Sequence, residues 1–294
     1  MRIIYIGTVA FSKAMLETLL RCGANIVGVV TQSDSLINSD FVDLSISCKT
    51  NTIPFIYSTN VNDVHEINWI RNLNPDIICC FGWSRKLNSE VLQCAKLGTI
   101  GFHPAKLPQN RGRHPIIWAL ALGLNETAST FFFMNEQIDA GDILSQQDIL
   151  IEYKDTAETL YQKIIYTAER QVQEFFPTLI NKSYKRIPQD DHHTNYWRKR
   201  SYRDGKIDFR MSSRSIYNLV RALSHPYPGA YVSWRQKDVH IWKVEEVNID
   251  MPNTEPGKVI DSYDSSILVK TGDGGILITH HGFEKLPLKG TYFL

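Results

Sequence analysis

Residues 99–142, TIGFHPAKLPQNRGRHPIIWALALGLNETASTFFFMNEQIDAGD, say more than any other stretch about how this chain folds. The order of apolar and turn-forming residues predicts a strand, a loop, a helix and a second strand. His103 falls just after the first strand, and Asp139 falls in an Asp-Ala-Gly-Asp turn near the end of the segment. The loop after the histidine is stiffened by Pro104, Pro108, Gly112 and Pro115. Because a stiff loop holds a reacting side chain still, His103 and Asp139 are our candidate catalytic pair.

Outward from this segment, apolar runs alternate with helical patterns along the first half of the chain. Short runs rich in β-branched residues predict buried strands at 2–7, 26–30 and 76–81. A helix is predicted between the first two strands, at about 12–20. This alternation predicts an α/β fold with a doubly wound, mostly parallel sheet. In such sheets ligands gather at the carboxyl ends of the strands, where Gly7, Gly82 and His103 lie.

The chain changes character after this first half. Residues 126–151 read as two extended stretches joined by a turn at 137–142, which predicts antiparallel pairing. Residues 156–176 have apolar side chains at helical spacing, and Thr156 is positioned to cap that helix. Short strands punctuated by turns then predict a small barrel or sandwich.

The region between the two halves is basic. Residues 182–206 hold eight Lys or Arg against three Asp and have few aliphatic side chains. We therefore interpret 181–206 as a linker whose charges face solvent. The predicted organisation is a catalytic domain at 1–180, this basic linker, and a C-terminal β domain at 207–294.

Composition excludes several classes of protein. The 294 residues are 43% hydrophobic and 21% charged, with a formal net charge of +1, so no global basic field is present to bind nucleic acid. No apolar run has the length of a membrane span. The start, MRIIYIGTVAF, predicts a strand and not a signal peptide, and five cysteines without histidines at ligand spacing predict reduced thiols. We expect a cytoplasmic protein with no metal site.

The segment that begins at His103 resembles the formyltransferases that use 10-formyltetrahydrofolate. The family's histidine corresponds to His103, and its Leu-Pro-x-x-Arg-Gly corresponds to Leu107, Pro108, Arg111 and Gly112. Its tryptophan-bearing helix corresponds to the helix with Trp118, and its Asp-x-Gly turn corresponds to the turn with Asp139. The second half resembles the OB-like domain of methionyl-tRNA formyltransferases and of some sugar formyltransferases. The matching pieces are Asp204-Gly205, Ile207-Asp208, Arg221-Ala222, 226–229 and 271–274. The resemblance implies a Rossmann-like domain followed by an OB-like β domain.

The resemblance also implies a reaction. Formyl transfer to an amine is acyl transfer, which needs an oxyanion stabilised and a proton moved. His103 would serve the first need and Asp139 the second. One position departs from the family, because Gly101 stands where the family has an asparagine that also donates to the formyl oxygen. Asn110 is our candidate substitute, although an asparagine beside Arg-Gly is equally a good turn residue. The alternatives are a backbone N–H and a less active enzyme.

Binding residues follow from the same resemblance. The 10-formyltetrahydrofolate pocket would be formed by Phe81, Gly82, Trp83, Ser84 and Arg85 together with Ile138 and Asp142 of the turn. Trp83 is equally well read as a core aromatic. The loop before the first helix is a candidate for binding the substrate's phosphates. Basic residues could make further contacts with these phosphates. The candidate substrate contacts are therefore Gly7, Thr8, Ser12, Lys106, Arg113 and Arg200. Arg111 and Arg198 are further candidates, and Arg111 is as well suited to bracing its loop.

The charge of the loop after the second strand indicates which molecule accepts the formyl group. Enzymes that formylate initiator methionyl-tRNA carry a basic loop after the second strand, whereas residues 31–48 here contain three aspartates and no Lys or Arg. We therefore favour a nucleotide-linked amino sugar, with a dTDP-amino-dideoxyhexose first, as in the biosynthesis of lipopolysaccharide O-antigen. A tRNA substrate and an inactive binding protein remain alternatives. No nucleic-acid or membrane partner is expected, and a homodimer is possible.

Overall fold

The computed structural model describes residues 1–35 and 38–293, which form two compact units. The N-terminal unit consists of residues 1–115, 127–149 and 162–197. The C-terminal unit consists of residues 116–126, 150–161 and 198–294. The C-terminal unit thus takes in two short segments, 116–126 and 150–161, that interrupt the N-terminal unit in sequence.

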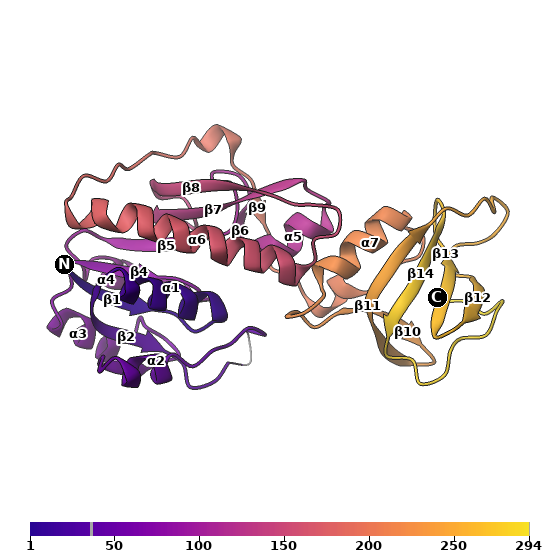
Figure 1. The fold of residues 1–294 in the computed structure, drawn as a ribbon, viewed down its shortest axis with the longest axis horizontal. Helices are drawn as coiled ribbons and strands as arrows, with labels where there is room; N and C mark the ends of the chain where they lie inside the picture. Colours follow the sequence, from indigo (N-terminus) through magenta and orange to yellow (C-terminus); the bar gives the residue numbers. More distant parts are fainter. Residues whose placement is uncertain (36–37, 294) are drawn as a thin grey trace. The chain divides into compact units, whose positions relative to one another are not determined.

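The N-terminal unit is built on a seven-stranded sheet (Figure 1). Its strand order is β3-β2-β1-β4-β5-β7-β8. The strands are β1 (Arg2–Ile6), β2 (Asn25–Thr31), β3 (Phe55–Tyr57), β4 (Ile77–Cys80), β5 (Thr99–His103), β7 (Glu126–Phe133) and β8 (Ile143–Leu150). The first five strands are parallel, and β7 runs antiparallel to β5. The prediction of a doubly wound, mostly parallel sheet is confirmed, as is the hairpin-like reversal at 137–142.

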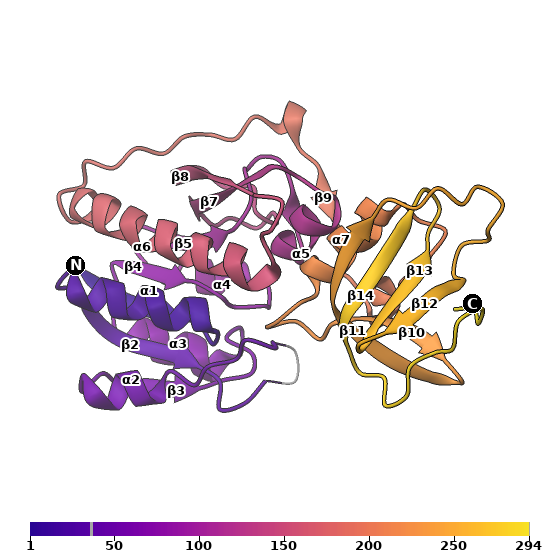
Figure 2. The ribbon, with the colours of Figure 1, turned by 45° about the vertical axis from the view of Figure 1, so that its right-hand side comes forward.

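Helices cover both faces of this sheet (Figures 1 and 2). Helices α1 (Ala10–Arg21) and α6 (Ala157–Ile180) bring aromatic rings to one face, where Phe11 stacks on Phe102 and Phe175 meets Phe131 edge-on. Helices α3 (Val64–Asn72) and α4 (Ser89–Leu92) pack on the other face. Two short helices, α2 (Ser45–Thr50) and α5 (Pro115–Ala121), complete the first half. As predicted, Thr156 caps α6, because its hydroxyl oxygen accepts from the Thr159 amide.

The segment that we interpreted as a solvated linker is divided between the two units. Residues 187–197 run along the N-terminal unit, where Ile187 bridges to Ile143 and strand β9 (Tyr196–Trp197) pairs with strand β6 (Arg111–Gly112). A short 3₁₀ helix, Asp191–His193, lies between these two attachments. From Arg198 onward the chain belongs to the C-terminal unit. A second 3₁₀ helix, Tyr202–Gly205, lies near the start of this part of the chain.

The C-terminal unit contains a five-stranded antiparallel sheet in the order β10-β11-β14-β13-β12. Its strands are β10 (Ala230–Trp234), β11 (Lys237–Val247), β12 (Val259–Tyr263), β13 (Ser266–Lys270) and β14 (Gly275–His281). Helix α7 (Ser213–Ala222) contributes Arg221, whose buried guanidinium donates to the carbonyls of Glu152, Tyr153 and Asp155. These bonds hold the excursion 150–161 against α7. The predicted C-terminal β domain is therefore confirmed as a separate antiparallel sheet.

None of the helices in residues 1–35 and 38–293 is long and apolar enough to cross a membrane. Within the same residues no group of His, Cys, Asp and Glu side chains is arranged to hold a metal ion.

Candidate active site

His103 and Asp139 lie together at the carboxyl end of the sheet. His103 is the last residue of β5 and is 5% exposed. Its Nδ1 is 3.6 Å from Oδ2 of Asp139, which is slightly beyond hydrogen-bond distance. Its Nε2 is 2.7 Å from the main-chain oxygen of Asn110. A carbonyl oxygen only accepts, so Nε2 carries a proton and the ring presents Nδ1 to the carboxylate.

Asn110 takes a different part from the one we predicted. Its side-chain oxygen accepts from Nδ2 of Asn195 at 3.1 Å, and its amide nitrogen donates to Oδ1 of Asn195 at 2.8 Å. The contact with His103 comes from the Asn110 carbonyl and not from its side chain. Asn110 has a φ of 62°, a left-handed conformation that asparagine tolerates better than most residues. The turn-residue interpretation of Asn110 is thus the one that the geometry favours.

The Asp139 carboxylate is also held by the histidine's own loop. Its Oδ2 accepts from the main-chain N–H of Gly112 at 2.9 Å. Gly112 has a φ of 109°, and a Cβ at this position would collide with the carbonyl oxygen of Trp197. A glycine is therefore needed where β6, β9 and the Asp139 turn meet.

Arg111 braces this loop, as one of our two interpretations held. It is 2% exposed, and its guanidinium donates to Gln189, Asp191 and Tyr196. A buried guanidinium that already has these partners is a structural anchor rather than a phosphate contact.

The predicted folate loop, residues 81–85, adjoins the pair through a chain of contacts. Nη1 of Arg113 donates to the carbonyl of Ser84 at 2.7 Å, which joins this loop to the one that carries Gly112. Phe81 is fully buried between Tyr5 and Phe131, so its side chain belongs to the core. The ring of Trp83 packs against the core. Its indole N–H is buried and has no partner among the described residues.

The rest of the predicted folate set is more open. Gly82 has a φ of 74°, and a Cβ there would collide with the Ser12 hydroxyl and the Val9 side chain. The Ser84 hydroxyl donates to Asn38, whereas Arg85 and Ile138 are exposed. Asp142 is half-buried, and its carbonyl accepts from the Phe133 amide.

Most donors of the predicted phosphate loop are used within the protein, although the buried Thr8 hydroxyl has no partner among the described residues. Gly7, Thr8 and Ser12 are all buried. The Ser12 hydroxyl donates to the Phe81 carbonyl at 2.6 Å and accepts from the amides of Thr8 and Val9. The amide of Ala10 donates to the carbonyl of Asp40. Because these donors at the start of α1 are used internally, our assignment of this loop to substrate phosphates is not supported by the geometry.

Most of the basic side chains that we predicted to bind phosphate already form ion pairs, ring contacts or hydrogen bonds within the protein. Nζ of Lys106 forms a 2.8 Å ion pair with Asp148 of β8. Arg200 is 9% exposed, lies 4.6 Å from the ring centre of Trp118 and donates to the Asp204 carbonyl. Burial lowers the pKa of the Arg200 guanidinium. Arg198 lies over the same ring and pairs with Asp204. Arg113 is exposed, and Nη1 of its guanidinium donates to the Ser84 carbonyl.

Gly101, where the family asparagine was expected, has no room for a side chain. A Cβ at this position would lie 2.8 Å from Cγ of Met134 and 3.1 Å from Cζ of Phe132. The thioether of Met134 thus fills the space on the His103 side of β5. The prediction missed Met134 because a methionine after a run of phenylalanines has the pattern of an ordinary core residue.

We expect Gly101→Asn to lower the free energy of unfolding by about 1–3 kcal/mol, the usual cost of overpacking. Met134→Ala should recover at least half of that loss in the double variant, because it vacates the space that the new side chain needs. Chemical denaturation of the two single variants and the double variant measures this coupling. Additive effects would show that Met134 does not fill the site of the missing side chain.

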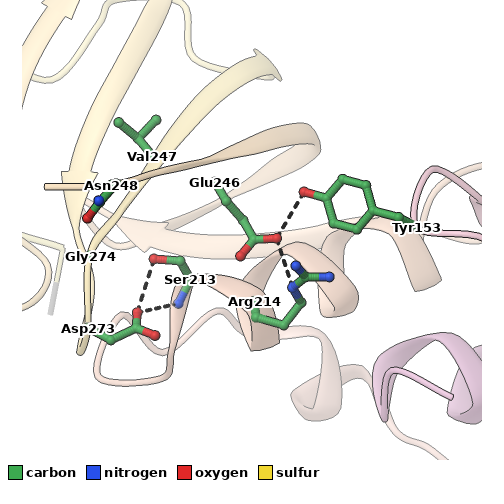
Figure 3. A pocket seen from close by; sticks show the side chains of 8 residues that line it. All are labelled: Tyr153, Ser213, Arg214, Glu246, Val247, Asn248, Asp273 and Gly274. Carbon is green, nitrogen blue, oxygen red and sulfur yellow. Dashed lines mark hydrogen bonds and ion pairs between the residues drawn. The ribbon is translucent and has the colours of Figure 1, made fainter. Parts of the chain in front are cut away.

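The C-terminal unit contains a pocket of its own, lined by Tyr153, Ser213, Arg214, Glu246, Val247, Asn248, Asp273 and Gly274 (Figure 3). Its polar groups pair with one another. Glu246 accepts from Arg214 and from the Tyr153 hydroxyl, and Asp273 accepts from the Ser213 amide at the start of α7. Burial and the Glu246 contact raise the pKa of Tyr153 to about 12. The Tyr153 hydroxyl, Nε of Arg214 and the Ser213 amide are therefore already occupied.

Sequence and structure comparisons identify relatives for nearly the whole chain. Residues 1–174 match the family described as "Formyl transferase", and residues 199–294 match "Formyl transferase, C-terminal domain". The bifunctional polymyxin resistance protein ArnA of Wigglesworthia glossinidia brevipalpis is 33% identical over 248 residues, which is 84% of this chain and 38% of that protein. The methionyl-tRNA formyltransferase of Halalkalibacterium halodurans is 33% identical over 278 residues, 93% of this chain and 87% of that protein.

A solved structure shares the fold. The N-formyltransferase of Helicobacter canadensis, crystallised with folinic acid and dTDP-3-aminofucose, superposes with a TM-score of 0.74 at 19% identity. The superposition covers 95% of this chain and 98% of that one.

Proposed function

Since this chain belongs to the formyl transferase family, we propose that it moves a formyl group from 10-formyltetrahydrofolate to the amine of a nucleotide-linked amino sugar. Formyl transfer and the folate co-substrate follow from the family, and the amino sugar is the new step. The observation that carries the catalytic part is the contact between buried His103 and partly buried Asp139 at the carboxyl end of β5.

The two ring nitrogens of His103 have separate tasks in this proposal. Nε2 is anchored by the Asn110 carbonyl, which fixes the plane of the ring. Nδ1 is the nitrogen that would contact the substrate. It lies 3.6 Å from Asp139, which is longer than a hydrogen bond, so a substrate atom can take the place of the carboxylate as its partner. A proton on Nδ1 would be stabilised by the Asp139 carboxylate and would serve as a donor to a developing oxyanion. Asp139, kept in place by the Gly112 amide, accepts the proton from the incoming amine as the new carbon–nitrogen bond forms, and that proton goes to the folate nitrogen as its bond to the formyl carbon breaks.

The residues of the 81–85 loop fit a folate. The main-chain groups of Gly82 and Trp83 make no hydrogen bond to another described residue, and the indole N–H of Trp83 is also unpaired. These groups are donors and acceptors of the kind that read the edge of a pterin ring. When bound, 10-formyltetrahydrofolate supplies the formyl group, and Gly82, Trp83 and the turn at 138–142 would hold it.

Charge supports the amino sugar over tRNA. A pocket at the carboxyl ends of β2 and β3 is lined by Asp34, Asp63 and Glu66, and no Lys or Arg lies among its lining residues. The stretch 31–48 that leads from β2 lacks basic residues as well. A surface of this kind repels the phosphate backbone that supplies most of the affinity for a nucleic acid.

A methionyl-tRNA formyltransferase is the second candidate. It is favoured by the 33% identity over 278 residues with the Halalkalibacterium halodurans enzyme of that name. The sequence identity to the amino-sugar enzyme of known structure is lower, at 19%, so that structure supports the sugar only through the shared fold.

A two-acceptor assay separates the candidates. With radiolabelled 10-formyltetrahydrofolate, we expect transfer to dTDP-amino-dideoxyhexoses at a rate that changes less than about 3-fold between 50 and 200 mM salt, because few phosphate contacts are involved. Transfer to initiator methionyl-tRNA should be at least ~10²-fold slower in kcat/KM. Efficient formylation of the tRNA that persists at 200 mM salt would overturn the sugar proposal.

A further inference from the structure

The strap, defined as residues 187–197, lies across the candidate site and contacts both of its halves. Asn195 pairs with Asn110 of the histidine loop, and β9 pairs with β6. At the other end, Ile187 is bridged to Ile143, just beyond the Asp139 turn. The strap therefore joins two loops that are far apart in sequence.

Gln189 makes this connection with one side chain. Its Oε1 accepts from Nε of Arg111 at 3.2 Å and from Nη2 at 2.7 Å. Its Nε2 donates to the carbonyls of Asp139 at 2.9 Å and Gly141 at 2.7 Å. An amide side chain has two donors and two acceptor positions, and Gln189 uses all four. Such saturation restricts the side chain to one arrangement.

The two sides of this bridge are the two sides of the candidate site. Arg111 precedes Gly112, whose N–H holds the Asp139 carboxylate. Gln189 holds the main chain of Asp139 itself. Loss of the bridge would free the turn that aims the carboxylate at His103, and a displacement of about 1 Å is enough to slow a reaction strongly.

We propose that Gln189 is a positioning residue that sets the Asp139 carboxylate against His103 by tying the Asp139 turn to Arg111. It acts through the main chain and touches neither reacting group. The kinetic part of this inference rests on the proposed formyl transfer, whereas the placement of the turn does not.

Gln189→Glu separates the two halves of the bridge. The carboxylate keeps acceptors for Arg111 but faces the carbonyls of Asp139 and Gly141 with oxygen atoms, so both donations are lost. Gln189→Ala removes both halves. Gln147→Ala is the matched control, because Gln147 is a partly exposed glutamine away from the strap whose Nε2 donates to Glu174.

We expect kcat to fall at least ~10-fold in Gln189→Glu and Gln189→Ala, with KM for the acceptor changed less than about 2-fold, because orientation and not substrate binding is lost. Gln147→Ala should match the wild type. An unchanged kcat in both Gln189 variants of an active enzyme would overturn the inference.

Hydrogen exchange of the Gly112 amide, which donates to Asp139, tests the placement without any activity. We expect exchange at Gly112 and across 139–142 to be at least ~10-fold faster in both Gln189 variants, with rates in α1 unchanged. Wild-type rates at Gly112, or an equal rise throughout the unit, would overturn the inference. If the wild type formylates no amino sugar, the proposed acceptor fails while this measurement still decides the role of Gln189.

Discussion

His103→Ala and Asp139→Asn should each lower formyl transfer by at least ~10²-fold while leaving a folded protein. We propose His103 as the donor to the developing oxyanion, and losses of this size follow removal of one positioned oxyanion or acid–base group. Asn at position 139 keeps an oxygen that can accept from the Gly112 amide, so the turn survives and only the charge and basicity are lost. The measurement is the initial rate of labelled formyl transfer to the acceptor that the wild type uses.

The control for this pair is a histidine of the same unit outside the site. His65 lies on α3 with its side chain 80% exposed, and His65→Ala should retain wild-type turnover. Thermal unfolding of all three variants should stay within a few degrees of the wild type. Near wild-type turnover in either His103→Ala or Asp139→Asn would remove that residue from the mechanism.

Much of the fold follows from patterns in the sequence. Apolar runs such as IVGVV at 26–30 are short and β-branched, and each forms a buried parallel strand as expected. The prediction of His103 at the end of a strand and Asp139 in a turn is also met by the geometry, because both depend on local turn chemistry. The contact between the two does not follow from strand direction, because β7 runs antiparallel to β5, and it depends on the turn after β7 bringing Asp139 back to His103.

The features that we did not predict from the sequence depend on main-chain hydrogen bonds and on the pairing of two-residue strands. The Asn110 carbonyl has no side-chain signature, so an asparagine near a histidine suggested an amide donor instead. Strands β6 and β9 are two residues each and have no periodicity to detect. The polar strap around Gln189 therefore read as a solvated linker, and Ser12 read as a phosphate contact although its hydroxyl closes the loop internally.

The turn that carries Asp139 depends on the absence of a side chain at Gly141. A Cβ at this position would overlap the carbonyl oxygen of Phe133 and lie 2.8 Å from its carbonyl carbon. Neither atom can move aside, because Phe133 is paired with Ile100 in the sheet and its amide donates to the Asp142 carbonyl at 2.8 Å. The added methyl must therefore push the turn away from β7.

We expect Gly141→Ala to lower the free energy of unfolding by more than about 3 kcal/mol, at the upper end of single substitutions, and to abolish detectable formyl transfer. Gly23→Ala is the matched control. Gly23 has a φ of 77° but open space where a Cβ would lie, so that variant should lose only about 1–2 kcal/mol, the cost of a left-handed backbone. Denaturant unfolding gives both values. If Gly141→Ala were no less stable than Gly23→Ala and still active, the close approach of Gly141 to Phe133 would not be what fixes Asp139, and the hold on the carboxylate would have to come from the Gly112 amide and Gln189.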